Sequence, residues 1–126
     1  MSATGILQTA TVIAKTTQTI MGVEIGTENI ECLRLFLDYT KGDETGVDVI
    51  LNLRRTTGGT GYQNKIWTAT AGVEASVIEK IRLTATGNYS YTWLYPCADF
   101  VYFTQGGSSN DGTPTGTLAA GYVTTS

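Results

Sequence analysis

The residues best suited to chemistry in this sequence are four carboxylates that lie close together, Asp38, Asp43, Glu44 and Asp48. Carboxylate oxygens are the ligands that Ca²⁺ prefers, and a binding loop must bring several of them together. The spacing of these four residues matches no EF-hand loop. Because Lys41 lies among them, the sequence favours a solvated turn in which the carboxylates pair with lysine, and it predicts no metal site.

The sequence offers no constellation for catalysis. It contains no histidine, which excludes Ser-His-Asp and Cys-His nucleophiles and every histidine-ligated metal. The Gly-rich run at residues 56–61 (TTGGTG) is no phosphate-binding loop, since no Gly-Lys-Ser/Thr follows it and it contains no basic residue. We therefore expect a protein that is not an enzyme, with no catalytic residue and no cofactor.

Four aromatic residues recur at every second position of one segment, Tyr89, Tyr91, Trp93 and Tyr95. Alternate positions of a β-strand share a face, so these rings would lie in a row. Such a row packs in a core or against a neighbouring strand, or it forms an exposed platform on which a sugar stacks. We favour packing, and we keep Tyr89, Tyr91 and Trp93 as the glycan platform of an alternative, a carbohydrate-binding module.

The two cysteines, Cys32 and Cys97, are too few for a disulfide framework and too far apart for a CxxC site. The simplest interpretation is two reduced thiols that act as small hydrophobic residues. The alternative is a disulfide between them, which would close a long loop. The first five residues, MSATG, lack the basic and apolar regions of a secretory signal, which favours reduced thiols.

Composition limits the kind of protein that carries these residues. The chain has 126 residues, enough for one domain, and 15% of them are charged, with a net charge of -3. A protein that binds nucleic-acid backbones needs clustered Lys and Arg, and a membrane span needs a long apolar run; neither is present. The 15 glycines and 23 threonines favour turns and strands. We expect one all-β domain over residues 1–126, with no direct nucleic-acid or membrane binding.

Two runs alternate between apolar and polar residues, residues 30–39 (IECLRLFLDY) and residues 46–54 (GVDVILNLR). Because a short polar turn separates them, they predict a β-hairpin. A second hairpin is predicted over residues 81–95, with Gly87-Asn88 as its two-residue turn. The predicted core consists of Leu33, Leu35, Leu37, Val47, Val49, Leu51, Ile81 and Leu83.

Further strands are predicted at residues 7–14, 20–25, 62–70, 100–105 and 116–122. Residues 73–81 also fit a helical stripe, but their β-branched residues favour a connection that leads into a strand. Seven or eight short strands at this spacing predict a β-sandwich of the jelly-roll type. The two ends, residues 1–5 and 124–126, are predicted to be short flexible tails.

The predicted first hairpin, LFLDYTKGDETGVDVILNLR at residues 35–54, resembles a pattern found in small structural proteins of tailed bacteriophages. The later segments TATGNYSYTW, CADFVYFTQGG and TPTGTLAAGYV are similar to the closing strands of that family, so the resemblance covers residues 30–123. It implies a virion component, such as a capsid decoration (cement) protein or a head–neck component.

A virion component of this kind would assemble in the cytoplasm of the bacterial host. Its partners would be other virion proteins, the major capsid protein or neck proteins near the portal, and its own copies in a homo-oligomer such as a trimer. Exposed Gly-rich loops and the tails are the candidate contacts, because they can order on binding without disturbing the sandwich. The candidate loop residues are Thr57, Gly58, Gly59, Gly106, Gly107, Ser108 and Asn110.

Overall fold

The chain folds as an all-β sandwich, which confirms the predicted fold class. The computed structural model describes residues 2–15, 17–70, 73–96, 98–108 and 113–126, and this part of the chain contains strands and no helix. The strands are β1 (Ser2–Val12), β2 (Thr19–Ile20), β3 (Ile25–Gly26), β4 (Cys32–Thr40), β5 (Val47–Arg54), β6 (Gly61–Gln63), β7 (Lys65–Thr70), β8 (Val73–Ile78), β9 (Lys80–Leu83), β10 (Gly87–Leu94), β11 (Phe100–Gly107) and β12 (Thr117–Thr125).

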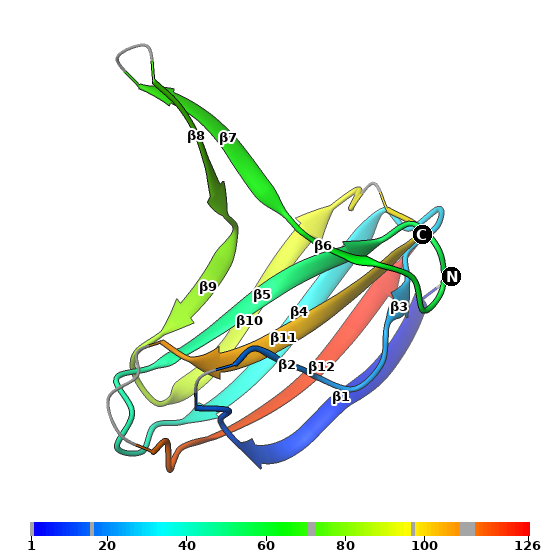
Figure 1. The fold of residues 1–126 in the computed structure, drawn as a ribbon. Helices are drawn as coiled ribbons and strands as arrows, with labels where there is room; N and C mark the ends of the chain where they lie inside the picture. The colour runs from blue at the N-terminus through cyan, green and yellow to red at the C-terminus, as the bar shows by residue number, and fades with distance from the viewer. Residues whose placement is uncertain (1, 16, 71–72, 97, 109–112) are drawn as a thin grey trace.

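Two antiparallel sheets form the sandwich (Figure 1). One sheet has the order β1-β12-β4-β10; in the other, β5 lies between β11 and the pair β6 and β9, and β2 and β3 pair with the far side of β11. If β2 with β3 and β6 with β9 are each counted as one interrupted strand, the two sheets contain eight strands. Numbered in this way along the chain, the strands of one sheet follow the order first, eighth, third, sixth. The strands of the other sheet follow the order second, seventh, fourth, fifth. These are the strand orders of a jelly roll.

The core lies between the two sheets and contains the predicted residues. Seven of the eight are buried, and the eighth, Ile81, is partly buried and packs against them. Their alternation along β4 and β9 follows from the pleat, which sends neighbouring side chains to opposite faces. β5 differs because it is buried on both faces from Val47 to Asn52, so its polar residues need partners within the protein.

Both predicted hairpins are wrong. β4 pairs with β10 and β12, whereas β5 pairs with β11, β6 and β9, so the turn after β4 crosses from one sheet to the other. The segment after β9 crosses back in the same way, and Gly87 and Asn88 are paired residues of β10 rather than a turn. The apolar faces are buried all the same, because the two sheets pack face to face.

The described ends of the chain are strands rather than the predicted tails. Ser2 pairs with Thr125 and Gly5 pairs with Tyr122, so β1 and β12 run side by side close to both termini. Gly5 leaves room for the Tyr122 ring, which occupies the space that a Cβ atom would need. Thr124, predicted to lie in a solvated tail, is buried.

The cysteine prediction is tested at one position only. Cys32 begins β4 as a half-buried free thiol, whereas Cys97 lies outside the described residues.

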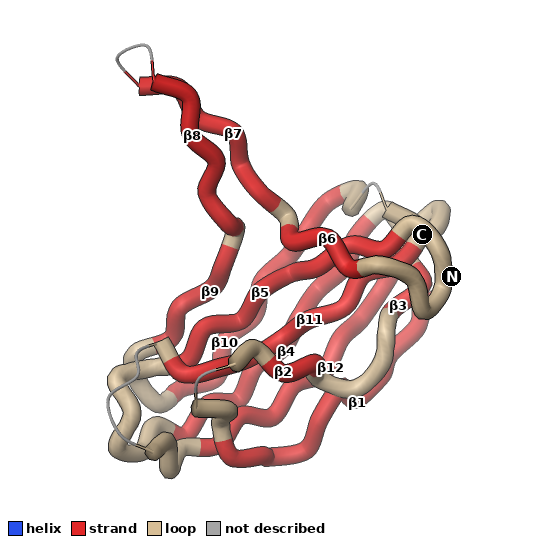
Figure 2. Tube along the Cα trace, viewed as in Figure 1, coloured by secondary structure: helices blue, strands red, loops and turns tan. Residues whose placement is uncertain are grey.

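One segment leaves the sandwich altogether. β7 and β8 pair only with each other and form a two-stranded ribbon that projects beyond both sheets (Figures 1 and 2). We call this ribbon, with the residues up to Glu79 that lead back to the sandwich, the arm; residues 71–72 lie outside the described residues. The predicted strand at residues 62–70 is thus divided between β6 in the sandwich and β7 in the arm. Residues 73–81, predicted as a connection that leads into a strand, are instead the strand β8 and the start of β9.

We predict that Leu35→Ala lowers the free energy of unfolding by about 2–5 kcal/mol, because it leaves a cavity in the core. The matched control is Leu94→Ala, since Leu94 is 70% exposed whereas Leu35 is fully buried, and its effect should stay within about 0.5 kcal/mol. Urea denaturation followed by tryptophan fluorescence measures both. Equal effects at the two positions would contradict the assignment of the core.

Candidate functional site

The aromatic row on β10 faces the interior of the sandwich. Tyr89, Tyr91 and Trp93 are half-buried and pack against the core, and the ring centroids of Trp93 and Phe103 lie 5.4 Å apart. Burial, and then the nearby Tyr89, raises the pKa of Tyr91. The preferred packing role is confirmed, and the three rings do not form the exposed row that a glycan platform requires. Tyr95, 64% exposed, lies beyond the end of β10.

In the predicted contact loop, Thr57 and Gly58 are exposed and Gly59 is half-buried, and the loop has a defined shape. The Gly59 amide donates to the Thr56 carbonyl at 3.0 Å, and Gly58 has φ +65°, which a type II turn requires at that position. Glu24 accepts hydrogen bonds from the Thr57 hydroxyl and, at 3.0 Å, from the Gly58 amide. The pKa of Glu24 is lowered, mainly by the hydrogen bond from Thr57, although burial acts in the opposite direction.

An open cleft of about 640 Å³ lies beside this loop. The Arg54 guanidinium stacks 4.3 Å from the centroid of the Tyr102 ring and lies 3.8 Å from the Glu24 carboxylate. Its positive charge is therefore partly balanced by groups of the protein itself. Arg55 and Tyr62 are exposed and are available to a partner. The cleft is lined by Leu53, Arg54, Arg55, Tyr62, Ala98 and Asp99.

The second predicted loop begins later than expected. Gly106 and Gly107 are the last residues of β11, and Gly106 is buried, so the prediction that both lie in a flexible loop is wrong. Glycine suits position 106 because a Cβ atom there would meet the Gln18 amide group at 2.8 Å. Ser108 is half-buried and its amide donates to a backbone carbonyl at 3.0 Å. Asn110 lies outside the described residues.

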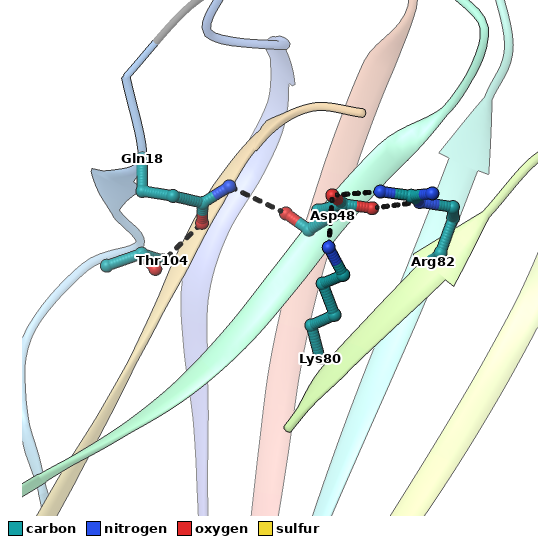
Figure 3. Close-up of polar contacts among 5 residues, drawn as sticks. All are labelled: Gln18, Asp48, Lys80, Arg82 and Thr104. Carbon is teal, nitrogen blue, oxygen red and sulfur yellow. Dashed lines mark hydrogen bonds and ion pairs between the residues drawn. The ribbon is translucent and has the colours of Figure 1, made fainter. Parts of the chain in front are cut away.

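Asp48 is the centre of a polar cluster on the outer face of the sheet that contains β5 (Figure 3). The Arg82 guanidinium donates two hydrogen bonds to the Asp48 carboxylate, at 2.8 and 2.9 Å, and Lys80 Nζ lies 3.8 Å away. Gln18 donates to the Asp48 carbonyl at 3.4 Å and accepts from Thr104 at 2.8 Å. The cluster therefore cross-links β5, β9 and β11, and the predicted solvated role of Asp48 is wrong.

Glu44 is also buried, although the sequence predicted a solvated turn. One carboxylate oxygen accepts hydrogen bonds from the Tyr39 hydroxyl and, at 2.9 Å, from the Gly42 amide. The other accepts from the Thr115 and Gly116 amides at 3.1 and 2.8 Å. Burial alone would raise the pKa of Glu44, but these hydrogen bonds outweigh it and hold the pKa at about 2.

The carboxylates thus do not converge on a common site. Asp38 and Asp43 are exposed, as predicted, whereas Glu44 and Asp48 are used in separate structural clusters. Among the described residues, no group of three or more Cys, Asp or Glu is placed to hold a metal ion. The described part of the chain also contains no helix long and apolar enough to cross a membrane.

The sequence analysis missed an apolar groove of about 430 Å³ on the outer face of the β1-β12-β4-β10 sheet. Ile6, Gly121 and Phe36 are aligned across β1, β12 and β4, so the absent side chain of Gly121 leaves a notch between two apolar residues. Ile6 is 79% and Phe36 40% exposed. The available signal was Phe36 itself, an aromatic residue on the polar face of an alternating strand. Such patches are typical of contact surfaces.

Comparisons with known proteins agree with the fold. No protein-family model and no curated protein matches the chain. Among solved structures, the chain is similar to the crystal structure of SPBc2 prophage-derived protein YomS, with a TM-score of 0.54 and 12% sequence identity. The match covers 100% of this chain and 94% of that one. The two proteins therefore share an all-β fold over nearly their whole length.

We predict that Glu44→Gln lowers the free energy of unfolding at pH 7 by about 2–4 kcal/mol, because the amide cannot accept every hydrogen bond that the carboxylate accepts. The contribution of Glu44 is fully present above its ordinary pKa of 4.5 and is lost as the pH falls toward about 2. The difference between wild type and variant should therefore shrink below pH 4.5.

Urea denaturation at pH 7, 4 and 3 measures this difference. Asp43→Asn is the control, since Asp43 is the exposed carboxylate next to Glu44. A difference between wild type and Glu44→Gln that stays constant over this pH range would contradict the role of the Glu44 carboxylate.

Proposed function

We propose that this chain is a non-enzymatic structural protein of a tailed-bacteriophage particle, a capsid decoration or head–neck component that acts by protein–protein contact. The observation that carries the proposal is the fold shared along the whole chain with a prophage-derived protein. The resemblance of residues 30–123 to small phage structural proteins supports the same assignment from the sequence.

The surface of the sandwich suits such a role. Only 15% of the residues are charged, and large apolar side chains are exposed at Ile6, Val23 and Leu94. The loop of Thr57 and Gly58 offers a shaped, uncharged projection. Each of these features gives a small contact, but a symmetric particle repeats it many times, and repetition converts weak contacts into stable attachment.

The carbohydrate-binding alternative is weakened at the residues that suggested it. Tyr89, Tyr91 and Trp93 pack against the core instead of presenting a flat row to solvent. Enzymatic activity is also disfavoured by the use of Glu44 and Asp48 in structural clusters, where their oxygens already accept protein hydrogen bonds.

The test is to purify phage particles by density gradient and to identify their proteins by mass spectrometry. We expect this chain in the particles at a fixed ratio to the shell protein. Cryo-electron microscopy then distinguishes symmetric clusters on the shell, which indicate decoration, from a ring around the portal axis, which indicates a neck component. Complete absence from purified particles would overturn the proposal.

We predict that Thr60→Glu, in the same exposed Gly-rich run as Thr57, lowers the occupancy of the protein in particles without changing its thermal stability. An extra negative charge on the exposed loop would have to be desolvated or repelled at the contact. The control is Thr84→Glu, because Thr84 is also exposed but lies outside the loop. Occupancy is measured as the ratio of this protein to the shell protein. Equal occupancy for both variants would show that the loop is not part of the contact surface.

A further inference from the structure

The arm is an insertion into a single strand of the sandwich. Asn52 on β5 pairs with Gln63 on β6, and Ile50 pairs with Lys80 on β9. Leu51 lies between them, and its carbonyl accepts a hydrogen bond from the Asn64 amide at 3.3 Å. Asn64 and Lys80 therefore occupy adjacent positions beside β5, and residues 65–79 loop out between them. The sandwich would have a continuous strand without the arm.

The root of the arm is fixed by specific hydrogen bonds. The Glu79 amide donates to the Asn64 carbonyl at 2.8 Å, and the Asn64 side-chain amide donates to one Glu79 oxygen at 2.6 Å. The other Glu79 oxygen accepts from Trp93 Nε1 on β10 at 2.9 Å. Both carboxylate oxygens are thus used to hold the two strands of the arm together and to tie them to the sandwich.

Beyond its root, the ribbon of β7 and β8 pairs with no other strand among the described residues. β7 and β8 pair from Lys65 with Ile78 to Thr70 with Val73, and Figures 1 and 2 show this ribbon projecting away from both sheets. Lys65 and Glu74 are the only charged residues in the two strands. An isolated two-stranded ribbon is marginally stable in water, so a ribbon with so little charge is suited to being covered by another molecule.

We propose that the arm docks on a second copy of this chain, in the apolar groove over Gly121 on the outer face of the β1-β12-β4-β10 sheet. The inference deepens the proposed function and rests on it for the expectation that copies of the chain meet in an assembly. The arm and the groove are different surfaces, so the contact is head-to-tail, and its repetition gives a ring or a filament.

Charge supports this pairing of surfaces. Asp38 is the one charged residue that lines the groove, and the ribbon carries one residue of each sign, Lys65 and Glu74. Two surfaces poor in charge can be desolvated together at little cost, and depletion of charge is the usual composition of an interface centre.

The size of the arm sets the strength that we expect from one contact. A standard protein–protein interface uses about 20–30 residues from each partner, and β7 and β8 have 6 residues each. One arm in one groove is therefore a weak contact. Closing a ring adds a further contact without the entropy of bringing in another molecule, which stabilises the whole assembly.

The experiment uses two variants that each lose one half of the contact. The first deletes residues 65–79 and joins Asn64 to Lys80, which keeps the pairing with β5 and retains the groove. The second, Phe36→Lys, keeps the arm and places a charge in the groove. Val23→Lys is the control, because Val23 is 70% exposed and does not line the groove. Trp67→Glu serves as the arm variant if the deletion does not fold.

We expect sedimentation velocity to show concentration-dependent association of wild type and Val23→Lys, weakened about tenfold or more in each half-contact variant. An equal mixture of the two variants should form dimers, because one still supplies a groove and the other an arm. A monomeric wild type, a half-contact variant that associates as strongly as wild type, or a mixture that stays monomeric would each overturn the inference. Association through the arm in a protein absent from phage particles would overturn the proposed function alone.

Discussion

The packing of β4 against β5 across the interior of the sandwich is the constraint on which the rest of the structure depends. Both strands carry apolar residues at alternate positions, and the buried sets belong to one core. Because the two strands are consecutive in the chain yet lie in different sheets, the turn between them must cross the end of the sandwich. That turn carries Glu44, whose carboxylate accepts hydrogen bonds from the amides of Gly42, Thr115 and Gly116. The crossing turn is thereby tied to the segment that leads into the last strand.

The sequence predicted those features of the fold that depend only on the local pattern of residues, such as which side chains of a strand face the core. Alternation identified the inward-facing residues of β4, such as Leu35, because the pleat alone decides which side chains share a face. The same pattern does not specify which strand lies alongside, and so two consecutive strands were predicted as a hairpin although they pack across the core. The pairing of β4 with β12 joins residues far apart in the chain, and no local signal encodes it.

The candidate site was less predictable for a related reason. A carboxylate in a polar turn is ordinarily solvated, and Glu44 is buried because its hydrogen-bond donors include backbone amides about seventy residues further along the chain. The exposed loop at Thr57 was predictable because consecutive glycines favour an open turn. The arm was not, because its two strands look like any other short strands until the pairing with β5 shows that Asn64 and Lys80 are neighbours.

This division between sandwich and arm has an energetic consequence. Inserting a segment between two adjacent positions of a strand costs loop-closure entropy, and this cost grows only slowly with the length of the segment. The arm therefore lowers the stability of the sandwich only slightly. The hydrogen bonds of Glu79 restrict the root of the arm, which would lower the entropy cost of ordering β7 and β8 in the proposed contact. A partner that binds the arm then stabilises the ribbon by mass action, without any change in the core. The proposed docking of the arm therefore leaves the hydrogen bonds and packing of the sandwich unchanged.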